Sequence, residues 1–67
     1  MSNEMKDWLW DTFSEVVLNA KVIDKVIQVI PYDNFYAIVH GLKDGYHVKY
    51  NVWLDDDGYL YYERNEE

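Results

Sequence analysis

The sequence contains no cysteine, one proline and only three glycines in 67 residues. Without cysteine, the chain can form neither a disulfide nor a zinc site built on thiolates. A domain of this size buries only about 60% of the surface that its unfolded chain exposes, so it is marginally stable. Two sources of added stability remain: a dense aromatic core, or association with a second chain, which stabilises the folded state by mass action.

Residues suited to catalysis or cofactor binding are scarce as well. The serine and threonine residues, Ser2, Thr12 and Ser14, all lie in one segment that contains no histidine, which leaves covalent catalysis almost nothing to build on. No glycine-rich phosphate loop occurs, so a nucleotide site of the known motif types is not expected. We therefore expect a protein that is not an enzyme and that has no catalytic residue and no cofactor.

Long apolar runs are also missing, because none approaches the roughly 18 residues of a membrane-spanning helix. The N-terminal segment is too acidic for a signal peptide, and these features favour a cytoplasmic protein. The net charge is −7, and the acidic residues are concentrated at the two ends of the chain. Phosphates and anionic lipids require a basic surface, so we expect no direct binding of nucleic acid and no membrane binding.

What the chain does contain is an amphipathic pattern over residues 4–19, which predicts a helix. Its apolar residues recur at steps of three and four and share one face: Met5, Leu9, Phe13, Val16, Val17 and Ala20. Residues 22–30 are ambiguous, because Ile23, Ile27 and Ile30 continue the helical step. We favour a strand, since β-branched residues lose side-chain freedom in a helix.

Beyond Pro31 the patterns predict strands over residues 35–41, 46–54 and 59–64. We thus expect a single small domain, residues 1–67, of the α+β class. One N-terminal helix would pack on a four-stranded antiparallel meander sheet.

The connections "LKDGY" and "DDDGY" both place Asp-Gly before Tyr. Two geometries compete: a two-residue type I′ turn, or a three-residue loop with glycine in the left-handed conformation. We favour the three-residue loop in both, which pairs Leu42 with Tyr46, Ile38 with Tyr50, Leu54 with Leu60, and Val52 with Tyr62.

In this register the helix covers the face formed by Tyr36, Ile38, His40, Leu42, Tyr46, Val48, Tyr50, Val52, Leu54, Leu60 and Tyr62. The opposite, open face carries Phe35, Ala37, Val39, His47, Lys49, Trp53, Tyr59 and Tyr61. Such an aromatic open face indicates an interface. The alternative is a one-residue error in register, which would exchange the two faces.

No metal site is expected. His40 and His47 point to opposite faces in the favoured register; in the other register they become diagonal neighbours, still without a third ligand. Calcium loops place acidic residues at alternate positions, whereas Asp55, Asp56 and Asp57 are contiguous. A solvated hairpin turn explains them.

The predicted helix also carries an acidic stripe. Glu4, Asp7, Asp11 and Glu15 follow steps of three, four and four, and like charges at this spacing destabilise a helix by about 0.2–0.5 kcal/mol per pair. Trp8 flanks the stripe. The acidic stripe is either a solvated face of an acidic protein or a recognition surface with an aromatic anchor.

An acidic, cysteine-free chain with the hairpin "DDDGYLYYE" resembles, in general character, small phage-type inhibitors of nucleic-acid enzymes. Anti-CRISPR proteins and uracil-DNA glycosylase inhibitors belong to this class. The resemblance implies a protein that occupies the DNA-binding surface of an enzyme. A second resemblance lies in the order of the elements. A helix and a strand followed by "FYAIVHGLKDGYHVKYNVWLDDDGYLYY" is similar to PepSY-type domains, which end in strands joined by an Asp-Gly turn.

We therefore expect a non-enzymatic inhibitor that binds a basic-surfaced protein partner, such as a nucleic-acid enzyme, by mimicking DNA. The expected partner-binding residues are Glu4, Asp7, Trp8, Asp11, Glu15, Trp53, Asp55, Asp56 and Asp57. The alternative is a structural or assembly module that forms a homodimer through its aromatic sheet face.

Overall fold

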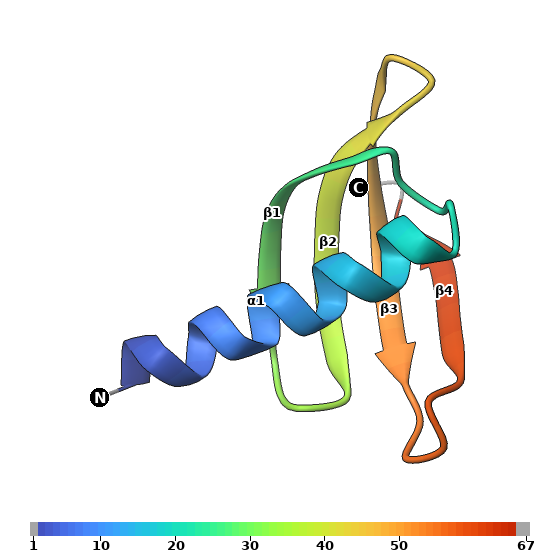
Figure 1. The fold of residues 1–67 in the computed structure, drawn as a ribbon. Helices are drawn as coiled ribbons and strands as arrows, with labels where there is room; N and C mark the ends of the chain where they lie inside the picture. Colours follow the sequence, from blue (N-terminus) through green and yellow to red (C-terminus); the bar gives the residue numbers. More distant parts are fainter. Residues whose placement is uncertain (1, 66–67) are drawn as a thin grey trace.

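The computed structural model describes residues 2–65, with side chains from Trp8 onward. Helix α1 (Ser2–Asn19) precedes four strands: β1 (Lys25–Pro31), β2 (Tyr36–Lys43), β3 (Tyr46–Leu54) and β4 (Leu60–Arg64). The strands form one antiparallel sheet in the order β1-β2-β3-β4, and α1 crosses one face of it (Figure 1). This is the α+β architecture that the sequence predicts.

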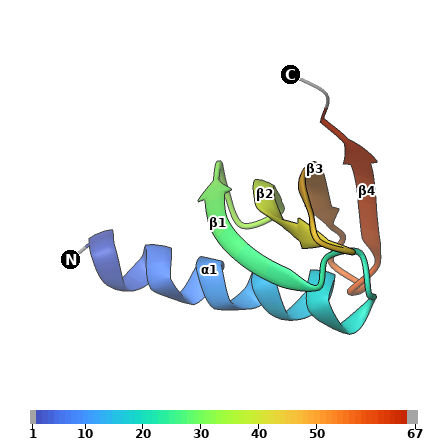
Figure 2. The ribbon, with the colours of Figure 1, turned by 90° about the horizontal axis from the view of Figure 1, so that it is seen from above.

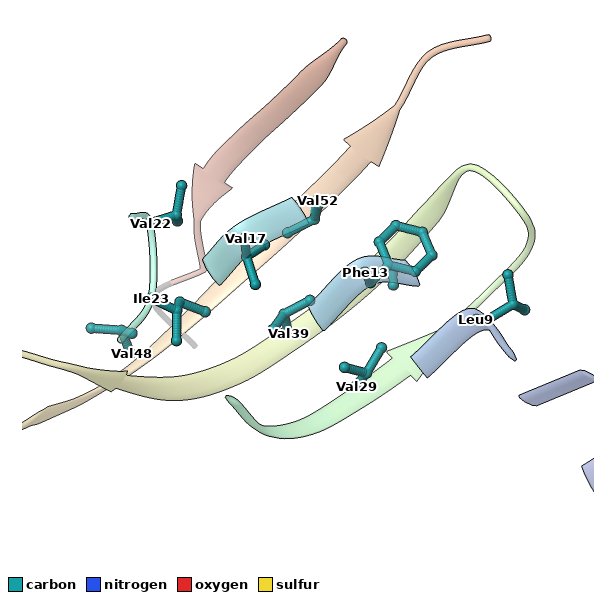
Figure 3. Packing of buried hydrophobic residues seen from close by; sticks show 10 residues of the cluster. Leu9, Phe13, Val17, Val22, Ile23, Val29, Val39, Val48 and Val52 are labelled. Atoms are coloured by element: carbon teal, nitrogen blue, oxygen red, sulfur yellow. The ribbon is translucent and has the colours of Figure 1, made fainter. Parts of the chain in front are cut away.

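The core lies between α1 and the sheet. Leu9, Phe13 and Val17 recur at four-residue steps and are buried, with Phe13 and Val17 fully enclosed. They meet valines from β1, β2 and β3, among them Val39 and Val52 (Figure 3). The helical periodicity therefore identified the buried face of α1 from Leu9 to Val17, with Val16 partly buried. Ala20 is exposed just beyond the end of α1, and the side chain of Met5 lies outside the described residues.

The ambiguous segment is divided between two kinds of structure. Residues 25–31 form β1, as favoured, but residues 22–24 belong to the connection from α1. Val22 and Ile23 are nevertheless buried, so the connection contributes to the core. A bulge between Val26 and Gln28 shifts the register of β1 against β2, which leaves Ile27 exposed.

The two Asp-Gly turns differ in geometry. At the β3–β4 turn, Leu54 pairs with Leu60 and Val52 with Tyr62, as predicted. The backbone N–H of Asp55 donates to the carbonyl of Tyr59 (2.9 Å). The three residues between them end in Gly58, which has a φ of 88°. Here the three-residue loop with a left-handed glycine is confirmed.

At the β2–β3 turn the favoured register is wrong. Leu42 pairs with His47, and Lys43 pairs with Tyr46, so only Asp44 and Gly45 form the turn. Both have positive φ, 54° and 84°, which is the type I′ conformation whose twist matches the flanking strands. The predicted pair of Ile38 with Tyr50 is likewise replaced by Ile38 with Asn51.

The one-residue difference exchanges the faces of β2. Ala37, Val39 and Gly41 face α1 and are buried, whereas the larger alternate residues of β2 face away. Gly41 lies where a Cβ would be 2.5 Å from Ile23 Cγ2 and closer still to the Lys25 carbonyl oxygen. Small residues on this side of β2 therefore let the α1–β1 connection and β1 approach closely.

The helix covers only one side of the sheet, as the view from above shows (Figure 2). The assignment of β3 and β4 residues to the two faces is as predicted: Val48 and Val52 are buried, and Tyr50, Leu54 and Leu60 pack against the core. We call the side away from α1 the open face.

Candidate interaction surfaces

The open face carries a row of aromatic side chains from the residue that follows β1 across β2, β3 and β4. Tyr36 pairs with Trp53, and Trp53 pairs with Tyr61. Tyr32, directly after β1, donates its backbone N–H to the carbonyl of Tyr36 (2.9 Å). We call Tyr32, Tyr36, Trp53 and Tyr61 the aromatic row.

Three rings of the aromatic row form a continuous stack. The ring centroids of Tyr32 and Tyr36 are 5.2 Å apart, with an interplanar angle of 18°. Those of Tyr36 and Trp53 are 5.1 Å apart at 23°. Tyr59 extends the series beyond Tyr61, at a centroid distance of 6.3 Å. Stacked rings at these distances stabilise one another, so the row is an ordered surface feature.

Much of this aromatic surface is exposed, including 61% of Tyr32 and 58% of Tyr61. The next row on the same face consists of Ile30, Ile38, Asn51 and Glu63. Further along the strands the open face becomes polar, with Gln28, His40, Lys49 and His47. An apolar band at one end of the strands thus adjoins a polar region at the other.

The two histidines share the open face, contrary to the favoured register. His40 Nε2 lies 3.1 Å from His47 Nδ1, and the ring centroids are 5.2 Å apart. The two-residue turn brings them together, because His40 pairs with Lys49 and His47 with Leu42. Among the described residues no group of three or more His, Cys, Asp or Glu could hold a metal ion.

Of the three aspartates in the β3–β4 turn, Asp55 accepts hydrogen bonds that stabilise the turn. Asp55 Oδ1 accepts a hydrogen bond from the Asp56 N–H (2.7 Å), and Gly58 N–H donates to the carbonyl of Asp55 (2.9 Å). All three aspartates are exposed. They form an acidic tip at the end of the sheet nearest the aromatic row.

The outer face of α1 carries the described part of the acidic stripe. Asp11 and Glu15 are exposed, and the one ion pair between described residues, Lys43 with Asp24, involves neither. Trp8 is 60% exposed and Leu18 40%. We call Trp8, Asp11, Glu15 and Leu18 the outer helix face. Glu4 and Asp7 belong to α1, but their side chains lie outside the described residues.

The predicted partner-binding residues therefore fall on separate surfaces. Trp8, Asp11 and Glu15 share α1, whereas Trp53 lies on the opposite side of the sheet, because successive residues of a strand alternate between faces and its neighbour Val52 is buried against α1. The aspartates 55–57 lie at the hairpin tip. No single described surface combines the helix carboxylates with Trp53.

A small polar cluster joins the α1–β1 connection to the β2–β3 turn. Asp24 Oδ2 accepts the N–H of Asp44 (2.8 Å), and Lys43 Nζ lies 3.5 Å from Asp24 Oδ1. Lys43 Nζ also donates to the carbonyl of Lys21 (3.0 Å). The hydrogen bond from Asp44 lowers the pKa of Asp24 below its ordinary value; desolvation opposes this effect and the charge of Lys43 assists it.

Sequence reasoning missed Tyr32 and Tyr36 as surface residues. The favoured register places Tyr36 under the helix, and Tyr32 lies outside every predicted strand. The signal that could have found them was Asp-Gly itself, since this dipeptide strongly favours the two-residue type I′ turn.

Comparison with known proteins adds no relative, because no protein-family model, curated protein or solved structure matches the chain. Within residues 2–65, no helix is both long and apolar enough to cross a membrane.

Proposed function

We propose that this chain is a small non-enzymatic protein that binds and inhibits a protein partner with a basic surface, such as an enzyme that acts on nucleic acid. The outer helix face carries the proposal. Trp8 is 60% exposed there, beside two exposed carboxylates that have no ion-pair partner among the described residues. A large aromatic group amid charge complementary to the partner is a frequent composition of binding hot spots.

Carboxylates on this face would take positions that nucleic acid otherwise occupies on the partner. Asp11 and Glu15 lie one helical turn apart, about 6 Å along the axis, whereas phosphates of one DNA strand follow at about 3.4 Å. The helix therefore offers fewer charges per unit length than DNA. We infer that Trp8 and Leu18 supply apolar contact that a phosphate backbone lacks.

The hairpin tip is a second acidic surface, and a matched pair of variants separates the two. Asp11→Lys with Glu15→Lys changes the outer helix face, and Asp56→Lys with Asp57→Lys changes the tip by the same charge. We expect a partner captured from lysate at low salt to be retained by the tip variant and lost by the helix variant.

The captured complex is then tested against short duplex DNA. Displacement of the partner by DNA, and its release by added salt as counter-charges are screened, are the expected results. Equal capture by wild type and the helix variant would contradict a role for the outer helix face. A complex unaffected by DNA would contradict mimicry.

A further inference from the structure

The open face is an ordered apolar surface that no described element covers. Tyr32 and Tyr61 are each more than half exposed, and Ile30 beside them is 43% exposed. Soluble monomers rarely leave a contiguous patch of this kind open to water unless it is a binding surface. The face is built on strands and ordered by ring stacking, so little conformational entropy would be lost on docking.

The dimensions of the open face match a modest interface between proteins. Four strands about 4.8 Å apart, with a rise of about 3.3 Å per residue over some eight residues, give a flat footprint of roughly 500 Å². Side-chain relief raises the accessible area above that value. Two such faces would bury more than about 1,000 Å² in total, which is the lower limit for specific interfaces.

The charges of the open face are self-complementary. Lys49 is paired with His40, and Glu63 is paired with Asn51 on the neighbouring strand, so this cation and this anion occupy adjacent rows. Lys25, which pairs with Leu42, is a second cation on the same face. The exposed carboxylates Asp11 and Glu15 lie on α1, on the other side of the sheet. A second copy can therefore approach here with opposite charges available and with the acidic helix directed away.

We propose that a second copy of this chain covers the open face, in a twofold dimer with sheet packed against sheet. A twofold axis across the strands places the aromatic row of each copy against the Leu42 and His47 end of the other. It also places Lys49 of each copy near Glu63 of its counterpart. In this arrangement the two aromatic rows lie toward the two ends of the interface, and Lys49 and Glu63 lie in the rows between them.

The dimer has a salt dependence opposite to that of binding to a basic partner. Each chain carries a charge of −7, so the two copies repel. Packed layers are about 10 Å apart, and the Debye length at physiological ionic strength is about 8 Å. The two acidic helices lie outside both sheets, about three such spacings apart, so their repulsion is already screened at physiological ionic strength. Raising the salt from about 0.01 M, where the Debye length is about 30 Å, toward about 0.1 M should therefore strengthen the dimer.

Sedimentation equilibrium over low to high micromolar concentration tests the proposal. Two tryptophan variants are matched: Trp53→Glu places a charge on the open face, and Trp8→Glu places the same charge on the outer helix face. We expect wild type and Trp8→Glu to dimerise, and Trp53→Glu to associate at least about tenfold more weakly, a loss of 1.4 kcal/mol or more. Circular dichroism verifies that each variant is folded.

A charge exchange tests the arrangement without an aromatic substitution. Lys49→Glu and Glu63→Lys should each weaken the dimer, because each places like charges together, and the double variant should restore it. A wild type that stays monomeric at high concentration would overturn the proposal, as would a dimer that Trp8→Glu weakens and Trp53→Glu leaves intact. The dimer does not depend on the proposed function, since separate variants test the two surfaces.

Discussion

Single residues with unusual backbone conformations determine where the elements end. Lys21 follows α1 with a φ of 62°. The N–H of Val22 donates to the carbonyl of Val17 (3.0 Å) and that of Lys21 to the carbonyl of Leu18 (3.1 Å). This is the Schellman arrangement, in which glycine usually occupies the left-handed position. A lysine there carries a steric penalty that glycine avoids.

Lys21→Gly should therefore stabilise the protein, by roughly 0.5–1 kcal/mol once the greater entropy of glycine in the unfolded chain is deducted. Urea unfolding measures the change. The carbonyl of Lys21 remains available to Lys43 in the variant. A lower midpoint for Lys21→Gly would show that the lysine side chain stabilises the folded state in some way not seen in the structure.

Gly41 predicts the opposite effect. A methyl group at this position would meet Ile23 and the Lys25 backbone, and overpacking of this kind typically costs about 1–3 kcal/mol. Gly41→Ala should lower the urea midpoint substantially. Gly45→Asn is the control, because nothing surrounds Gly45 within 4 Å and asparagine tolerates positive φ. Similar effects of the two substitutions would contradict the close approach at Gly41.

Asp24 predicts a pH dependence. Its pKa is lowered from 3.8 in the folded state, so the unfolded chain binds its proton more readily. The resulting stability is present above the unfolded pKa and is lost as the pH falls through the lower, folded pKa. The stability difference between wild type and Asp24→Asn should thus be constant above about pH 5 and shrink as the pH falls further, toward the folded pKa. A difference that stays constant below about pH 5 would show that Asp24 does not interact as described.

Helices and strands were predictable where one pattern sufficed. The spacing of Leu9, Phe13 and Val17 identifies the buried side of α1, and strict alternation in β3 places Val48 and Val52 on the core face. Neither pattern requires knowledge of a distant contact. The start of β1 was less clear, because Val22 and Ile23 are buried without belonging to the strand.

The register of β2 was not predictable by the same reasoning. Both turns contain Asp-Gly-Tyr, yet one has two residues and the other three. The close approach of the α1–β1 connection requires Gly41 beneath it, and Gly41 faces α1 only with the two-residue turn at Asp44 and Gly45. That requirement is tertiary. The preference of Asp-Gly for the two-residue turn favours the observed register of β2, but the same preference fails at Asp57 and Gly58, so it does not decide the register alone.

The ring stack gives a prediction for the sheet as an element. Tyr36 is the middle ring, in contact with Tyr32 and Trp53, and aromatic pairs contribute about 0.5–1.5 kcal/mol beyond burial. Tyr36→Ala should lower stability by about 1–3 kcal/mol and change the near-ultraviolet circular dichroism of Trp53. Tyr46→Ala, at a tyrosine that is 76% exposed, should do neither. An unchanged tryptophan signal in Tyr36→Ala would contradict the stack.

At the scale of the whole molecule, the two candidate surfaces lie on opposite sides of a thin two-layer domain. The outer helix face is acidic, and the open face is aromatic with charges of both signs. If both proposals hold, a dimer directs two acidic helices outward, and simultaneous contact with a repeated basic surface would raise apparent affinity by avidity. Between about 0.01 M and 0.1 M, added salt should weaken binding to the partner and strengthen the dimer.

Fluorine NMR of the protein labelled with 5-fluorotryptophan tests this division of roles most directly. The chain has three tryptophans, of which Trp8 reports on the outer helix face and Trp53 on the open face. Raising the protein concentration should shift the Trp53 resonance and leave Trp8 unchanged. Adding an arginine-rich peptide as a basic probe should shift Trp8 and leave Trp53 unchanged. The division of roles between the two surfaces would be contradicted if both resonances responded alike to each titration. It would also be contradicted if Trp53 alone responded to the basic peptide.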